Sequence, residues 1–192
     1  MNRERGLDGV NSYTRELGFH PLETLAPGQS WLDLCCGSGR ALIEAAKIGA
    51  YTLVGVDLVD YFAQASHQPG PTLITASLST WQPSQTFDLI TCVHGLHYIG
   101  DKLGLLTRIA SWLAPGGVFA GHLDLANVKT PKPFRPSRFG LDYDARRHLI
   151  KCHGPRRLAF PYEYAGADPD AGPNYTGQPA VDSVYLANAN AK

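Results

Sequence analysis

The sequence lacks the long apolar run that a membrane-spanning helix needs. No stretch approaches the roughly 20 consecutive apolar residues that cross a bilayer, and the opening residues, MNRERG, are not followed by the apolar segment of a secretory signal. The chain also has no net charge, with 17 basic and 17 acidic side chains, which disfavours a nucleic-acid-binding protein that depends on a strongly basic domain. These absences predict a cytoplasmic protein without nucleic-acid or membrane partners.

Cysteine is scarce as well. The four cysteines lie at positions 35, 36, 92 and 152, a spacing that matches neither a zinc site nor a disulfide framework. We therefore predict a reduced protein with no metal site. Hydrophobic residues make up 44% of the chain, which suits a folded core, and a length of 192 residues suits a single domain.

Short apolar runs alternate with stretches of helical spacing, as expected for βαβ units around a parallel sheet. The run 87–93 is too apolar for an edge strand, so it is predicted to be buried on both faces. The predicted strands are 30–35, 52–57, 72–75, 87–93 and 118–123, and the predicted helices are 40–48, 58–67 and 102–113. The predicted fold class is α/β, with a doubly wound sheet of five parallel strands.

The character of the sequence changes after Asp124. Residues 127–140 contain three prolines and no clear periodicity, so we expect a loop there. A short helix is predicted over Tyr143–Lys151. Arg157–Tyr164 and Asp182–Leu186 are predicted to form a C-terminal antiparallel pair of strands, joined by a stretch rich in glycine, proline and aspartate.

A glycine-containing turn follows the first predicted strand. Parallel sheets bind ligands at the carboxyl ends of their strands, and glycine lets the backbone approach a ligand closely because it has no Cβ. One interpretation of this turn is a dinucleotide fingerprint, Gly37-x-Gly39-x-x-Leu42, with leucine where the third glycine belongs. Because that pattern is broken, an NAD(P)-dependent oxidoreductase is the weaker interpretation.

The second interpretation rests on four segments in a fixed order. They are Asp33-Leu34-Cys35-Cys36-Gly37-Ser38-Gly39, Val54–Asp57, Phe87–Ile99 and Leu113–Gly117. In this order the chain resembles the class I S-adenosylmethionine-dependent methyltransferases, with Cys35 in place of the usual first glycine. The resemblance covers residues 31–124, about half of the chain. It implies a Rossmann-like fold, S-adenosylmethionine as cofactor and S-adenosylhomocysteine as product.

The resemblance also implies which residues hold the cofactor. Asp33 would reach the ammonium group, and Asp57, with two acceptor oxygens, would bind both ribose hydroxyls. Ser77 stands where the family often has an acidic residue near the adenine. The residues expected to contact the cofactor are Asp33, Cys35, Gly37, Gly39, Asp57, Leu58, Ser77, Leu78 and Val93. The structural alternatives are a carboxylate bonded to nearby turn amides at Asp33 and a helix N-cap at Asp57.

Under this interpretation the single domain has three segments. They are an N-terminal cap at 1–28, a cofactor-binding core at 29–124, and an acceptor-side loop, helix and strand pair at 125–192. In the cap, Tyr13 and Arg15 resemble helix residues that often close over the cofactor in this family. An exposed helix face is the alternative for both residues.

Candidate catalytic groups follow the fourth and fifth strands: His94, His97 and Asp124. A methyl sulfonium is already electrophilic, so the protein mainly supplies positioning, and a base helps when the acceptor is a hydroxyl or a carbon acid. His94 is expected to lie closest to the methyl group. The alternative for His97 is a structural place in the pocket wall, and His122 is expected in the core.

The methyl acceptor is predicted to be a small molecule. The Asn/Asp-Pro-Pro-aromatic motif of methylases that act on base amines is absent after strand four, where the sequence reads VHGL. Residues 129–157 carry a net charge of +7, which indicates either a solvated surface or an anionic acceptor facing Lys129, Lys132, Arg135 and Arg138. A non-catalytic protein that binds S-adenosylmethionine or S-adenosylhomocysteine is a further alternative.

Overall fold

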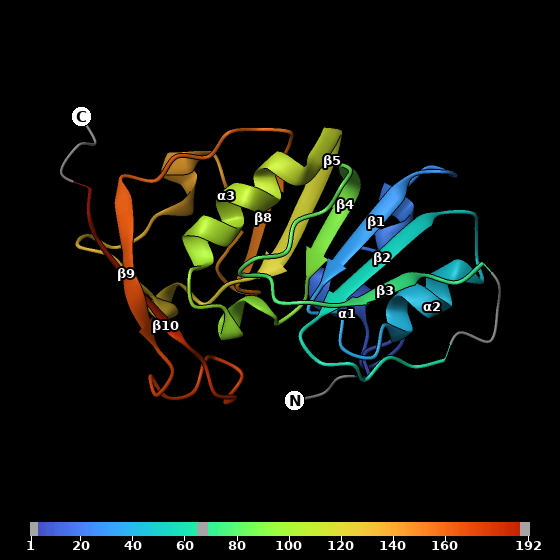
Figure 1. Cartoon of the computed structure of the whole chain (residues 1–192), viewed down its shortest axis with the longest axis horizontal. Coiled ribbons are helices and arrows are strands. Elements are labelled where there is room, and N and C mark those ends of the chain that lie inside the picture. The colour runs from blue at the N-terminus through green and yellow to red at the C-terminus, as the bar shows by residue number, and fades with distance from the viewer. Residues whose placement is uncertain (1–3, 65–68, 189–192) are drawn as a thin grey trace.

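A seven-stranded sheet forms the centre of the computed structural model, which describes residues 4–64 and 69–188 (Figure 1). The strand order is β3-β2-β1-β4-β5-β8-β7. These strands are β1 (Ser30–Leu34), β2 (Thr52–Asp57), β3 (Thr72–Thr75), β4 (Phe87–Cys92), β5 (Leu113–His122), β7 (Asp142–Asp144) and β8 (Leu149–His153). Strands β1 to β5 are parallel, which confirms the predicted α/β class and its Rossmann-like sheet.

Helices cover both faces of this sheet. The α-helices are α1 (Tyr13–Leu17), α2 (Arg40–Ala46) and α3 (Lys102–Trp112). Short 3₁₀ helices lie at η1 (Pro21–Thr24), η2 (Leu96–Tyr98), η3 (Leu125–Asn127) and η4 (Pro136–Phe139). Successive side chains of a strand point to opposite faces. Trp31 of β1 is buried with residues of α1 and α2, whereas Leu32 is buried with residues of α3, so these helices lie on opposite faces.

The predicted helix over 58–67 is wrong for its described part, residues 58–64, which form no helix. Leu58 and Tyr61 are exposed, so the segment has no apolar face to bury against the sheet. The carboxylate of Asp57 accepts the backbone N–H of Val59 and holds a turn there instead. Residues 65–67 lie outside the described residues.

The predicted helix Tyr143–Lys151 is also wrong, because this segment is a hairpin formed by β7 and β8. Asp144 holds the turn by accepting two backbone N–H groups from it. β8 pairs antiparallel with β5 and buries Leu149 and Ile150. Pairing with the sheet buries the apolar side chains and at the same time satisfies the backbone groups along the edge of β5, which a helix in this place would leave unpaired.

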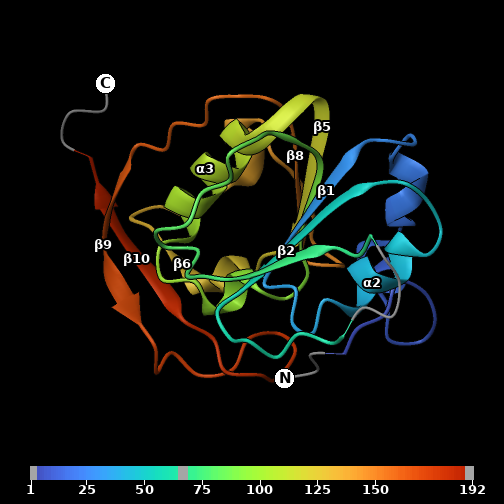
Figure 2. The same cartoon turned by 45° about the vertical axis from the view of Figure 1, so that its right-hand side comes forward.

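A second sheet lies beside α3, at the end of the molecule away from α2 (Figure 2). It consists of β6 (Val128–Lys129), β10 (Asp182–Ala187) and β9 (Tyr162–Asp168), in that order. The predicted antiparallel pair is confirmed as β9 and β10. β9 starts later than predicted, β10 starts at the predicted residue, and the pair forms a sheet of its own with β6.

A buried ammonium group joins the second sheet to α3. Lys102 is fully buried, and its Nζ donates to the carbonyls of Ile99 and Val181 and to the hydroxyl of Ser183. Burial lowers the pKa of Lys102 to about 8. The contacts with Val181 and Ser183 fix the start of β10 against the N-terminal turn of α3.

β5 starts earlier than predicted, at Leu113. Its pairing with β4 is irregular between Phe87 and Leu89, and Gly116 has a φ of 79°. Residues 114–117 therefore form an interruption within the paired strand rather than part of a regular ladder. None of the helices described within residues 4–64 and 69–188 is long and apolar enough to cross a membrane.

Candidate functional site

A cleft of about 860 Å³ opens at the carboxyl ends of the parallel strands. One wall consists of residues at or after the ends of β1 to β4, and the other combines the N-terminal segment with residues of β9 and the loop before β10. Seven of the predicted cofactor residues line it: Cys35, Gly37, Asp57, Leu58, Ser77, Leu78 and Val93. Small-molecule sites typically measure about 300–1,000 Å³, so the cleft is large enough for a cofactor together with a small acceptor.

The turn after β1 lines the cleft with backbone atoms that side chains do not cover. Cys35, Gly37 and Gly39 have φ angles of 56°, 60° and 72°, a conformation that glycine adopts without strain. A Cβ at Gly95 would collide with the Cβ of Cys35, so the loop after β4 packs directly against this turn. Gly39 is not among the described residues that line the cleft. It is the N-cap of α2, where a Cβ would lie 2.8 Å from the side chain of Leu73.

Asp57 holds its carboxylate between two backbone amides at the end of β2. Oδ2 accepts the N–H of Gly37 at 2.8 Å, and Oδ1 accepts the N–H of Val59 at 3.2 Å. Each oxygen of a carboxylate can accept a second hydrogen bond, so both remain able to bind a vicinal diol. The helix N-cap considered for Asp57 is wrong, because the described residues 58–64 form a turn rather than a helix.

Asp33 is buried in β1 and is not among the described residues that line the cleft. Its Oδ1 accepts from the hydroxyl of Thr91 and its Oδ2 from the hydroxyl of Tyr13, each at 2.6 Å. Burial raises the pKa of Asp33 to about 7, although the two hydrogen bonds act in the opposite direction. These donors are hydroxyls rather than the turn amides considered above. Of its two hydrogen-bond partners, Tyr13 is the one that also lines the cleft.

Helix α1 closes one side of the cleft. Tyr13 is buried and lines the cleft, so an exposed helix face is wrong for this residue. Arg15 is exposed, and its guanidinium donates to the carbonyl of Val10. Of the two helix residues that the resemblance implied, Tyr13 therefore lines the cleft and Arg15 does not.

The predicted adenine side follows β3 and is fixed by α3. Ser77 shares a hydrogen bond with Ser79 through their hydroxyl oxygens, 2.7 Å apart. The guanidinium of Arg108 donates to the carbonyls of Leu78 and Ser79. Arg108 also lines the cleft, so α3 sets the position of this loop.

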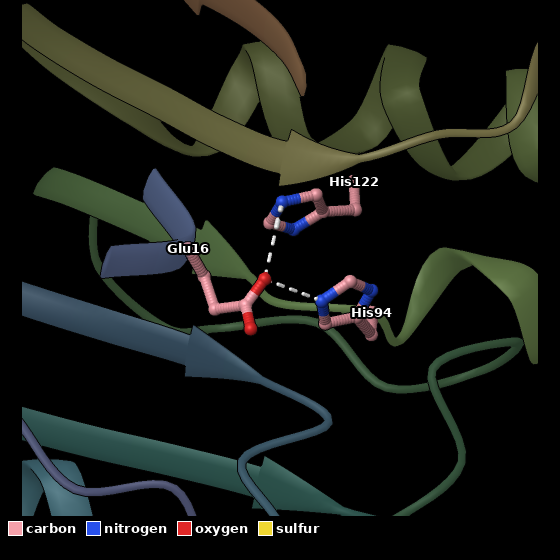
Figure 3. Close-up of side chains that lie close together, drawn as sticks. All are labelled: Glu16, His94 and His122. Carbon is pink, nitrogen blue, oxygen red and sulfur yellow. Dashed lines mark hydrogen bonds and ion pairs between the residues drawn. The ribbon is translucent and has the colours of Figure 1, made fainter. Parts of the chain in front are cut away.

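His94 meets two other ionisable side chains at the acceptor end of the cleft (Figure 3). Its Nε2 lies 2.8 Å from Oε2 of Glu16, and the Nε2 of His122 lies 3.9 Å from the same oxygen. The two imidazole rings are stacked, with centroids 4.2 Å apart. The other nitrogen of His94, Nδ1, lies 3.3 Å from the hydroxyl of Tyr175. His94 itself has a φ of 57°.

The protonation states of this cluster follow from burial and contact. The hydrogen bond with His94 lowers the pKa of Glu16 to about 2, so its carboxylate is ionised and can only accept. Nε2 of His94 therefore donates to this carboxylate, and the hydroxyl of Tyr175 lies beside Nδ1. Burial lowers the pKa of His122 to about 3, which leaves that ring neutral.

His97 and Asp124 are not among the described residues that line the cleft. His97 is buried, neither ring nitrogen has a hydrogen-bond partner in the described structure, and burial lowers its pKa to about 4. Asp124 accepts the backbone N–H groups of Ala126 and Tyr175, so it holds η3 and the segment before β10 together. Of the three candidate catalytic residues, His94 is the one that faces the cleft.

The basic segment 129–157 lies away from the cleft. The cations expected to face an anionic acceptor are not among the described lining residues: Lys129, Lys132, Arg135 and Arg138. Lys129 instead pairs with Asp182 at 3.1 Å. The guanidinium groups that do line the cleft belong to Arg5 and Arg108, so the structure favours the solvated-surface alternative for this segment.

Sequence reasoning missed Glu16, Thr91 and Tyr175. Glu16 follows Tyr13 by three residues, which places both on neighbouring positions of one helix face, so the signal that identified Tyr13 could have led to Glu16. Thr91 sits in a buried strand, where a hydroxyl requires a partner. Tyr175 lies in a glycine- and proline-rich loop without periodicity and offers no comparable signal.

The parallel sheet, the turn after β1 and the carboxylate at the end of β2 are the architecture of a class I S-adenosylmethionine-dependent methyltransferase, which confirms the resemblance. The sequence model of the family described as "methyltransferase domain" matches residues 11–171. The chain belongs to this family.

Curated relatives agree with this placement. A demethylmenaquinone methyltransferase of Corynebacterium urealyticum is 32% identical over 107 residues, which cover 56% of this chain and 45% of the relative. A ubiquinone biosynthesis O-methyltransferase of Bordetella bronchiseptica is 26% identical over 178 residues, covering 85% of this chain and 71% of the relative. The chain thus spans less than half of the first relative and about 70% of the second.

A solved structure is also similar to this chain. Coclaurine N-methyltransferase bound to N-methylheliamine and SAH matches with a TM-score of 0.48 and 20% identity, over 57% of this chain and 32% of that one.

Proposed function

We propose that this protein transfers the methyl group of S-adenosylmethionine to a small aromatic acceptor that carries an ionisable hydroxyl. The observation that carries the proposal is the cleft that Asp57 and the turn after β1 share with His94. The relatives named for demethylmenaquinone and ubiquinone biosynthesis support an acceptor of the quinol class. Tyr98 and Tyr164 also line the cleft and supply rings against which an aromatic acceptor would pack.

The cofactor half of the cleft suits the chemistry of S-adenosylmethionine. Asp57 has both oxygens fixed by backbone amides and can accept from two ribose hydroxyls. Ser77 and Leu78 lie where the adenine is expected. Cys35 and Gly37 present backbone beside the methionine portion. The predicted contact of Asp33 with the ammonium group becomes an indirect one in this proposal, made through the hydroxyl of Tyr13.

The acceptor half places a base where the methyl group would be transferred. Nδ1 of His94 holds a lone pair, because Nε2 donates to Glu16. An acceptor hydroxyl that takes the place of the Tyr175 hydroxyl would donate its proton to Nδ1 as the oxygen attacks the methyl group. The Glu16 carboxylate orients the imidazole and stabilises the imidazolium that forms.

Calorimetric titration with S-adenosylhomocysteine tests the cofactor assignment. Asp57→Asn should weaken binding about 10- to 100-fold, because it removes one charge-assisted acceptor and keeps the hydrogen bond from Gly37. Asp60→Asn is the matched control, since Asp60 does not line the cleft, and its affinity should equal that of the wild type. Unchanged affinity in Asp57→Asn, or stabilisation of the protein by NAD or NADP instead, would contradict the assignment.

Release of S-adenosylhomocysteine from S-adenosylmethionine in the presence of a panel of catechols and hydroquinones tests the activity. Turnover should require a phenolic acceptor and fall by about 10²-fold or more in His94→Gln. His153→Gln, which changes an exposed histidine on β8, should retain wild-type turnover. Tight binding of the cofactor with no turnover on any member of the panel would identify a non-catalytic binding protein instead.

A further inference from the structure

The cluster of Glu16, His94 and His122 has the composition and spacing of a metal site. The three residues come from different elements: Glu16 from α1, His94 from the loop after β4, and His122 from the end of β5. Their ligand atoms all lie within 4.8 Å of one another, and Figure 3 shows one nitrogen of each imidazole lying beside the same oxygen of Glu16. Among the described residues, no other group of three or more potential ligands has such spacing.

The distances within the cluster are compatible with an ion. Two ligand atoms that each lie about 2.1 Å from a tetrahedral ion are about 3.4 Å apart. Oε2 of Glu16 lies 2.8 Å from Nε2 of His94, a hydrogen-bond distance, and 3.9 Å from Nε2 of His122, which is too long for a hydrogen bond. These two values bracket the expected separation. Because the two imidazole rings are stacked nearly parallel, binding one ion at both nitrogens would also require one ring to turn.

His122 supplies an independent observation. Its side chain is 98% buried, being 2% exposed, and its Nδ1 has no hydrogen-bond partner in the described structure. Its Nε2 points at a carboxylate that lies beyond hydrogen-bond distance. This imidazole is neutral, buried and beside an ionised carboxylate to which it makes no hydrogen bond. The lone pair on one of its ring nitrogens is therefore available to bind a cation.

We propose that Glu16, His94 and His122 bind a divalent transition metal ion, with Zn²⁺ as the best match. Two imidazoles and one carboxylate are a ligand set of catalytic zinc sites, which keep a fourth position open for water or substrate. His94 lines the cleft, so the open position faces the acceptor. The Tyr175 hydroxyl lies 3.3 Å from Nδ1 of His94 and would accept a hydrogen bond from Nδ1–H, the tautomer that metal binding at Nε2 requires. Arg5 lies 3.5 Å from Oε1 of Glu16, which leaves Oε2 to the ion.

Metal binding would change the chemistry of the acceptor end. Nδ1 of His94 would carry a proton and could no longer act as a base. An acceptor oxygen bound at the open position would instead lose its proton more readily, because the ion stabilises the oxyanion. This last step rests on the proposed function, whereas the metal site itself does not.

Titration of chelator-treated protein with Zn²⁺ alone tests the site without cofactor or acceptor. One ion should bind per chain, and Glu16→Gln should weaken binding by at least about 100-fold, since even outer partners of metal ligands are worth about 10–100-fold. His153→Gln is the matched control, because His153 also faces a carboxylate, Asp142 at 3.7 Å, but is exposed. Its affinity should equal that of the wild type.

The absorption spectrum of the Co²⁺-loaded protein separates this site from the four cysteines, because thiolate ligands give charge-transfer bands that nitrogen and oxygen ligands do not. The proposal predicts a spectrum without thiolate bands that is lost in Glu16→Gln. His122→Asn should lose it as well, and if that buried variant fails to fold, Glu16→Gln decides. Equal Zn²⁺ affinity in wild type and Glu16→Gln, or thiolate bands in the Co²⁺ spectrum, would overturn the proposal. Neither result would bear on binding of S-adenosylhomocysteine.

Discussion

Cys35 carries the backbone strain of the cofactor turn. Its φ of 56° lies in the left-handed region, which costs a residue with a Cβ about 1–2 kcal/mol. Cys35→Gly should therefore be more stable than Cys35→Ala by about 1 kcal/mol, since both variants lose the thiol and only glycine adopts this φ freely. Urea unfolding followed by circular dichroism would measure the difference. A glycine variant less stable than the alanine variant would contradict this account.

Single residues could be assigned from sequence where a motif fixes their backbone. Asp57 ends a strand whose neighbours are specified by the parallel sheet, so its place at the cleft could be predicted from position alone. Glu16 and His122 could not be assigned in this way. They lie 106 positions apart in the numbering and meet only because α1 packs beside the end of β5, a contact that no local pattern encodes.

The docking of α1 onto the sheet depends on one buried carboxyl group. Tyr13 on α1 and Thr91 on β4 both donate to Asp33 on β1, so a single side chain joins three elements. The pKa of Asp33 rises to about 7 in the folded protein from an ordinary value near 3.9. At pH values between these two, the folded state keeps a proton on Asp33 that the unfolded state has released. Stability should therefore decline as the pH rises through this window and level off above pH 7.

Comparison of wild type with Asp33→Asn isolates this effect. The variant does not titrate at this position. Between pH 5 and pH 7, the unfolding free energy of the wild type should therefore fall by about 2 kcal/mol relative to that of the variant. Chemical denaturation at four pH values would provide the comparison. Parallel pH profiles for the two proteins would refute the shifted pKa.

Whole elements were predictable when their pattern had a single solution. The five parallel strands could be predicted, because each apolar run is flanked by turn residues and is long enough to be buried. The structure of segments 58–67 and 143–151 could not be predicted, since a mixed polar and apolar pattern fits a helix, a turn or an edge strand equally well. In 143–151 the free edge of β5 decided the outcome, and that edge exists only once the sheet has formed.

At the scale of the molecule, Lys102 links the second sheet to α3, which packs on the main sheet. Lys102→Met should lower the unfolding free energy by about 1–3 kcal/mol, because the carbonyls of Ile99 and Val181 lose their donor inside the protein. Lys47→Met, at an exposed lysine, should change it by less than about 0.5 kcal/mol. Hydrogen exchange should locate the loss, with faster exchange in β9 and β10 than in β1 and β4. Uniform acceleration across both sheets would argue against a local linking role.

The two walls of the cleft are completed at different times during synthesis. The cleft residues Cys35, Asp57 and Val93, at or just after the ends of β1, β2 and β4, all precede residue 124, whereas Tyr164, Thr176 and Gln178 on the opposite wall follow it. Chains fold from the N-terminus as the ribosome extends them, so the wall proposed to bind the cofactor would assemble first. The wall proposed to face the acceptor would be completed only when residues 164–178 have been added, and a chain that stops at residue 124 would lack it.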